Sequence, residues 1–256
     1  MIAAGRRIYG LGAASLGAVT LAYGAFASVW LPVPAHLPCY RLLAYACGGV
    51  LVLAGLAVNL PRAAAPTALA LAAFFGACVL ILYAPLAVAR PLGWDLWQSI
   101  AESTVMSAGG VLAWTQTPGV GGPRAHAAAR IARLVFGGCL LVFGVSHFVY
   151  AKFTAAMVPA WLPPSQMVWA YLTGLAQIAA GLAVLSGVRA RLGAILLTVM
   201  YALFSALVHI PAIVSGPSSQ ANWGEAAINL TLIGAAWVLA DSLAATSRSS
   251  GRSSPR

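Results

Sequence analysis

The chain contains the same apolar pattern twice, 126 positions apart. Residues 44–58 read AYACGGVLVLAGLAV and residues 170–184 read AYLTGLAQIAAGLAV, with eight of fifteen positions identical and no gap. Agreement at one fixed spacing is typical of a duplicated structural unit. The chain should therefore fold as two copies of one unit. Further pairs at this offset are Arg7 and Arg133, Pro85 and Pro211, Val88 and Val214, Pro91 and Pro217, and Trp97 and Trp223.

The composition indicates that this unit lies in a membrane. Of the 256 residues, 61% are hydrophobic and only 7% are charged. A water-soluble globule of this size could not bury that much apolar surface. The predicted fold class is therefore all-α, with eight transmembrane helices as two parallel-oriented four-helix bundles. Runs of about twenty apolar residues, enough to cross a bilayer as helix, predict the crossings at residues 8–30, 42–60, 66–88, 96–115, 131–153, 167–186, 191–212 and 223–243.

The basic residues are distributed unevenly between the two ends of these predicted helices. Eleven arginines fall on one side, and Arg41, Arg90 and Lys152 fall on the other. Because basic residues collect on the cytoplasmic side, we expect a multi-pass protein of the bacterial inner (plasma) membrane with both termini in the cytoplasm. An even number of crossings per copy makes both copies point the same way. Topology thus accounts for the net charge of +10, and the expected partner is the lipid bilayer, not nucleic acid.

The chain has two predicted membrane repeats, a polar linker between them and a polar tail after the second. Residues 1–115 form the first predicted membrane repeat and residues 131–245 the second. Residues 116–130 are rich in Gly and Pro and predict an exposed cytoplasmic linker. Residues 246–256 read TSRSSGRSSPR and predict a disordered basic tail. A cleaved signal peptide, with a small-x-small site at residues 25–27, is the alternative for the N-terminus, but its removal would leave the repeats unequal.

Each copy carries matching structural signals. Proline-rich strings, WLPVPAHLP in the first copy and MVPAWLPP in the second, predict rigid turns, because proline removes a backbone donor and disfavours helix before it. Glycines recur seven residues apart in the duplicated helix, at Gly48 and Gly55 and again at Gly174 and Gly181. This spacing places both glycines on one helix face and predicts close packing against a neighbouring helix.

Three tryptophans at the predicted outer ends of the helices have two open interpretations. Trp97, Trp161 and Trp223 could anchor the helices at the lipid headgroups as an aromatic belt. They could also line a ligand pocket.

Polar side chains inside the predicted crossings are the candidates for function, because a charge at the bilayer centre costs about 2–3 kcal/mol or more. In the second copy these candidates are His147, Gln177, His209, Glu225 and Asn229. All except Gln177 should lie in the outer half of the bilayer. With Gln177 included, four helices offer polar groups to one pocket. Glu225 and Asn229, four residues apart, share a helix face. Hydrogen bonding between helices is the structural alternative for each residue.

The first copy lacks these polar residues. It has one candidate of its own, Glu102, about one turn deeper than the level of Glu225, and the sequence does not identify its partner. The pocket is therefore expected in the second copy. At the constant offset, Tyr83 replaces His209, Ser99 replaces Glu225, Ser103 replaces Asn229 and Leu51 replaces Gln177.

Two chemistries are open for such a pocket, and the catalytic residues remain unknown. A neutral histidine beside a carboxylate can pass protons to a membrane-soluble quinol. Two histidines from separate helices can ligate a haem, the less favoured cofactor. No metal site is predicted, because the four cysteines form no CxxC pair and no cluster with histidine.

The second copy, from Arg133 to about Ala240, resembles the DoxX-like family of small four-helix membrane proteins. The resemblance is carried by RLVFGGCLLVFGVSHF, the MVPAWLPP loop, AYLTGLAQIAAGLAVL and the VHIPA string. The first copy looks like a diverged duplicate, with FASVWLPVP. This resemblance implies a membrane subunit in a redox or quinone-associated setting, with a partner redox subunit and no agreed catalytic motif. A small-solute transporter using the intramembrane carboxylates and a membrane scaffold are the alternatives, so enzymatic activity stays undecided.

Overall fold

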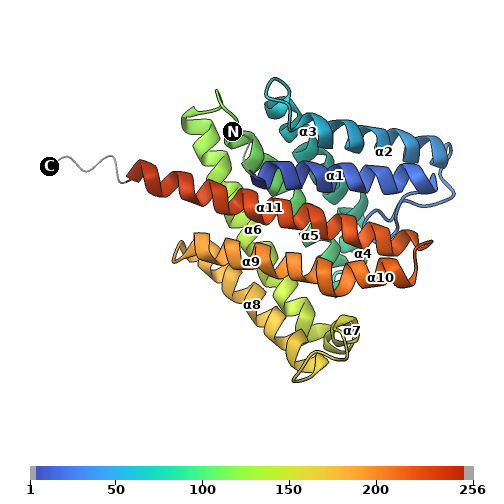
Figure 1. The fold of residues 1–256 in the computed structure, drawn as a ribbon. Helices are drawn as coiled ribbons and strands as arrows, with labels where there is room; N and C mark the ends of the chain where they lie inside the picture. The colour runs from blue at the N-terminus through green and yellow to red at the C-terminus, as the bar shows by residue number, and fades with distance from the viewer. Residues whose placement is uncertain (1–3, 251–256) are drawn as a thin grey trace.

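The computed structural model describes residues 4–250, with side chains as far as residue 244, and all regular structure in that range is helical (Figure 1). The first half of the chain contains α1 (Ala4–Tyr23), α2 (Tyr40–Ala57), α3 (Ala64–Ala77), the π-helical turn η1 (Cys78–Tyr83), α4 (Ala84–Ala89) and α5 (Trp94–Thr115). The second half contains α6 (Gly122–Val149), α7 (Ala151–Met157), α8 (Gln166–Ser186), α9 (Ala190–Phe204), the π-helical turn η2 (Ser205–His209), α10 (Ile210–Ser215) and α11 (Gln220–Ser250).

Six helical segments in the described part of the chain are long and apolar enough to cross a membrane. They are α2, the continuous segment α3–η1–α4, α6, α8, the continuous segment α9–η2–α10, and α11. The other two long helices, α1 and α5, are less apolar: α1 begins with Arg6 and Arg7, and α5 carries Asp95 and Glu102. Both have one face covered by other helices, where polar side chains are shielded from lipid.

The two π-helical turns occupy equivalent positions in the two halves. Each is followed by a proline, Pro85 at the start of α4 and Pro211 at the start of α10. A proline inside a helix lacks the N–H donor, and its ring clashes with the carbonyl oxygen four residues earlier, so the preceding turn widens. The duplicated prolines thus account for the duplicated π-helical turns.

The recurrent glycines lie at close helix contacts, as their spacing predicts. A Cβ atom added to Gly55 would lie 2.5 Å from the Gly10 oxygen, and one added to Gly181 would lie 2.8 Å from the Gly137 oxygen. The backbones of α1 and α2, and of α6 and α8, can approach this closely only because no side chain stands between them. Gly10 of α1 and Gly137 of α6 thus occupy equivalent positions, 127 residues apart. Gly55 of α2 and Gly181 of α8 are also equivalent, and they are 126 residues apart.

The two halves are interleaved. In the first half α1 packs on α2 and α5 packs on α3, yet α1 also packs along α11 and α5 packs along α6 (Figure 1). Packed neighbours therefore form a closed ring in the order α1, α2, α3, α5, α6, α8, α9 and α11, and α5 touches α11 across its centre. The two halves therefore share an extensive interface.

Several boundaries differ from the sequence prediction, and α1 ends at Tyr23 where the predicted crossing runs to residue 30. The expected linker, 116–130, is shorter, because α6 begins at Gly122 with Pro123 in its first turn and an alanine-rich stretch after it. The segment between α6 and α8 contains a short helix, α7, that the sequence did not predict. Helix α11 continues to Ser250, so the first part of the predicted tail is helical, and residues 251–256 lie outside the described residues.

Candidate functional site

A cavity of about 560 Å³ opens among the helices of the second half, with one wall supplied by the first half. This volume is typical of sites that hold a small organic molecule. All six polar residues predicted from the sequence line it: Glu102, His147, Gln177, His209, Glu225 and Asn229. They come from α5, α6, α8, η2 and α11, so elements far apart in the chain meet at this cavity.

His147 is held in one orientation by partners on α8. The Nε2 atoms of His147 and Gln177 are 2.9 Å apart, and the Tyr201 hydroxyl donates to Gln177 Oε1 over 3.3 Å. His147 Nδ1 lies 3.2 Å from the Ala170 oxygen and 2.9 Å from Thr173 Oγ1. A neutral imidazole protonated at Nδ1 satisfies this network, because Nδ1 then donates to the carbonyl and Nε2 accepts from the amide.

The approach of His147 to α8 depends on a glycine. A Cβ atom added to Gly174 would lie 2.8 Å from the Cβ atom of His147 and 3.0 Å from the Gly144 oxygen. The recurrent glycine that brings the two helices together therefore also sets the position of this imidazole.

Asn229 on α11 forms hydrogen bonds with the junction of α9 and η2. Its Nδ2 atom donates to the Tyr201 oxygen over 2.8 Å and to Ser205 Oγ over 2.7 Å. Both acceptors lie where α9 passes into η2. The buried amide thus has a structural role as well as a place in the cavity wall.

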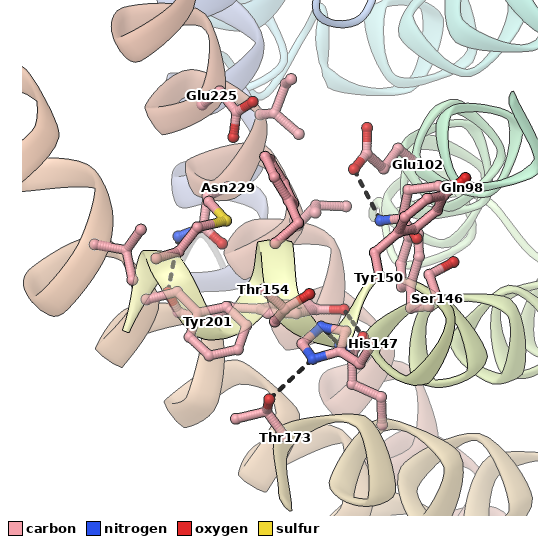
Figure 2. Close-up of a pocket in the computed structure, with 18 of the residues that line it drawn as sticks. Gln98, Glu102, Ser146, His147, Tyr150, Thr154, Thr173, Tyr201, Glu225 and Asn229 are labelled. Atoms are coloured by element: carbon pink, nitrogen blue, oxygen red, sulfur yellow. Dashed lines mark hydrogen bonds between the residues drawn. The ribbon is translucent and has the colours of Figure 1, made fainter. Parts of the chain in front are cut away.

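The two carboxylates face the cavity from different helices (Figure 2). Glu102 accepts a hydrogen bond from Gln98 Nε2 over 3.1 Å, which identifies the partner that the sequence could not. Within residues 4–244, Glu225 and His209 make no hydrogen bond or ion pair, and the buried Gln98 Oε1 has no hydrogen-bond partner. Several acceptor groups at the cavity are therefore available to a ligand.

Charge is segregated around this cavity. Three of the four acidic side chains of the protein, Asp95, Glu102 and Glu225, line it, and only Asp241 lies elsewhere. None of the lysine and arginine side chains in the described part of the chain lines it. Asp95 is paired with Arg90 at the rim, with 3.0 Å between Oδ2 and Nη2 and more than half of each side chain exposed. A protein of net charge +10 thus surrounds a cavity with unpaired carboxylates.

Sequence analysis missed part of the wall. Gln98, Tyr150, Thr154, Thr173 and Tyr201 also line the cavity. Gln98 and Tyr150 fall at predicted helix ends, where polar residues are ordinary, and Thr154 belongs to the unpredicted α7. Spacing from Glu102 is the one signal that could have found Gln98, because residues four apart share a helix face.

The three candidate tryptophans do not line this cavity. The indole N–H of Trp97 donates to the Pro91 oxygen over 2.9 Å, and that of Trp223 donates to the Pro217 oxygen over 2.8 Å. Trp161 is 72% exposed. Trp97 and Trp223, partly exposed and fixed at helix ends, have the arrangement expected of headgroup anchors, whereas Trp161 lines a neighbouring depression between the α7 loop and α10.

The equivalent region of the first half is packed with side chains. Three buried residues stand in it where Gln177, Tyr201 and His209 stand in the second half: Leu51, Phe75 and Tyr83. Trp30 lies against them, with its ring centroid 6.1 Å from that of Phe75 and its carbonyl oxygen accepting from the Tyr83 hydroxyl. Only 1% of Trp30 is exposed.

Potential cofactor ligands are sparse in the described part of the chain. No group of three or more His, Cys, Asp or Glu residues comes close enough there to hold a metal ion. Haem ligation by His147 and His209 would require breaking the contacts of His147, because both of its ring nitrogens already have partners.

Residues 136–240 match the model of a family described as Domain of unknown function (DUF8561). The match covers less than half of the chain and includes five of the six candidate residues, all except Glu102. Comparison with curated proteins and with solved structures gives no match.

Proposed function

We propose that this chain is an inner-membrane carrier for a small solute, in which Glu102 and Glu225 bind the solute in the cavity. The protein crosses the membrane eight times, as two fused DoxX-like units that point the same way. Six apolar helices and the uneven distribution of arginines support this topology. Helices α1 and α5 complete the crossings, with their polar faces covered by other helices.

The segregation of charge around the cavity carries the proposal. Carboxylates inside a membrane protein mark solute and ion pathways, since their cost is otherwise avoided. Here two carboxylates from different helices face one cavity, and no lysine or arginine in the described residues lines it. A purely structural role would favour a paired carboxylate, and Glu225 has no such pair among residues 4–244.

Retention of metabolites tests the proposal. Proteoliposomes containing the protein are incubated with a soluble cell extract, washed, and analysed by mass spectrometry for retained solutes. The wild type should enrich at least one solute, and Glu102→Gln with Glu225→Gln should abolish that enrichment. Asp241→Asn is the matched control, because it removes a carboxylate outside the cavity. Equal enrichment in all three proteins would exclude these carboxylates from binding.

The topology has its own test. Reporter fusions at both termini should give cytoplasmic signals, and reporters inserted near residues 36 and 162 should give signals outside. A terminus on the outer side would overturn the eight-crossing topology and with it the outer position of the cavity.

A quinone-associated membrane subunit, working with a partner redox subunit, is the second candidate. One observation favours it: the cavity shares Met157, Val158 and Val208 with a second depression between the α7 loop and α10, which gives a hydrophobic molecule a lateral route. Quinone extracted from protein purified in mild detergent should then be stoichiometric and should be lost in His147→Leu. A Soret band in the same sample would instead indicate haem.

A further inference from the structure

We propose that the solute is an organic ammonium ion with an apolar substituent. Its charged group lies between Glu102 and Glu225, and its substituent points toward α7 and the depression beside α10. This inference rests on the proposed solute-binding function, and it adds the chemical class of the ligand and its orientation.

The part of the cavity around Glu102 and Glu225 offers hydrogen-bond acceptors and lacks charged donors. Glu225 and His209 make no hydrogen bond in the described part of the chain, and Glu102 has only the Gln98 amide as donor. Gln98 Oε1 is buried without a partner among these residues. An ammonium ion supplies both the missing positive charge and N–H donors, whereas an anion would meet two carboxylates.

Apolar and aromatic side chains form much of the remaining lining of the cavity. Phe143, Phe204 and Ile228 line the interior, and Phe153 and Met157 line the side formed by α7. Aromatic faces attract ammonium groups as well as apolar surface, so one lining suits both parts of such a molecule. A hydrophilic metal cation would gain nothing from these walls.

The cavity lies next to the depression that would take the substituent, because the two share part of their lining. Met157, Val158 and Val208 belong both to the cavity and to the adjacent depression, whose further lining includes Ala156 and Leu207. In an eight-crossing topology this depression lies on the flank of the protein. A substituent longer than the cavity can therefore extend toward lipid while the ammonium group stays at the carboxylates.

A matched set of small molecules tests the head group. Hexylamine, hexanol and hexanoate share one apolar chain, and an alkylamine, like the lysine side chain, is protonated near pH 7. Titration calorimetry on the purified protein in detergent should detect saturable binding of hexylamine. Hexanol and hexanoate should bind at least about tenfold more weakly, since a charged hydrogen-bond partner is worth about that factor or more.

Variants test the position of each part. Glu102→Gln and Glu225→Gln should each weaken hexylamine about tenfold, and Asp241→Asn should leave it unchanged. Methylamine should bind at least about tenfold more weakly than hexylamine, because it lacks the buried chain. Ala156→Trp, which narrows the depression at an exposed site on α7, should weaken hexylamine severalfold and leave methylamine unaffected.

The outcomes separate this inference from the proposed function. Equal binding of hexanol and hexylamine, or undiminished hexylamine binding in both Gln variants, would overturn the ammonium ligand. If proteoliposomes still enrich a neutral or acidic solute in a carboxylate-dependent way, the carrier function stands and its ligand class is wrong. If Ala156→Trp weakens hexylamine and methylamine equally, the substituent does not follow the depression.

Discussion

The two halves of this molecule use one sequence motif in opposite ways. The string WLP follows the first helix of the first half and recurs between α7 and α8 in the second half. In the first half its tryptophan, Trp30, is 1% exposed and packs against Phe75 and Tyr83. In the second half its tryptophan, Trp161, is 72% exposed, and α7 stands beside an open cavity. One unit is closed by an indole and the other is left open.

This difference separates scaffold from function. Both halves keep the glycine contacts, the prolines and the π-helical turns, because these set how the helices meet. The two halves differ in the side chains that occupy the space between these helices. The first half places apolar and aromatic side chains at positions where the second half places an amide and a histidine. The first half is thus packed where the second half has an open cavity.

The largest effect should come from removing the buried indole. Trp30→Ala should lower the free energy of unfolding by about 3–5 kcal/mol, because it opens a cavity in a packed region. Trp161→Ala, the same change in the exposed copy, should alter it by less than about 0.5 kcal/mol. Reversible unfolding in mixed micelles measures both. Equal losses would mean that the first half is not closed by Trp30.

Exchanging the residues at one equivalent position should have the next largest effect. Leu51→Gln should cost about 3 kcal/mol, since the first half offers an apolar site to the buried amide. Gln177→Leu should cost about 2 kcal/mol, because Tyr201 and His147 each lose a partner. The nuclear magnetic resonance signal of the His147 ring should shift in Gln177→Leu only. A stable Leu51→Gln protein would reveal a polar site in the first half.

The smallest effect is expected at the duplicated glycines. Gly48→Ala and Gly174→Ala should each cost about 1–2 kcal/mol, because an added Cβ would lie 2.9 Å and 2.8 Å from neighbouring atoms. Gly49→Ala is the control, since no atom lies within 4 Å of its added Cβ, and it should be neutral or stabilising. Thermal unfolding ranks the three variants. Only Gly174→Ala should also weaken ligand binding, through the displaced His147.

Much of the architecture follows from sequence because its causes are local. Apolar runs predict helices, and the recurrent glycines predict where helices meet closely. A simple rule predicts that the candidate residues lie together: when the direction of each helix is predicted, polar groups at similar depth in the bilayer are expected to lie near each other. That rule needs only chain order and span length, and it groups His147, His209, Glu225 and Asn229; Glu102, from the first copy, joins them through the packing of α5 against α6 and α11.

The remainder depends on which helix packs against which, and periodicity cannot supply that. The pattern of α1 defines an apolar face but does not indicate that α11 covers it. Gln98 and Tyr150 resemble ordinary residues of helix ends until tertiary contacts turn them toward a cavity. The exposure of Trp161 could not be predicted either, because Trp30 stands in the same WLP string and is buried.

The ring of helices also bears on the history of the chain. Since the first helix of each half packs along the last helix of the other, a single four-helix unit would leave both of these helices uncovered. Two identical units would cover them by meeting around a two-fold axis. Such a homodimer would carry two identical cavities or none, whereas one chain with a short segment between α5 and α6 can carry a single asymmetric site.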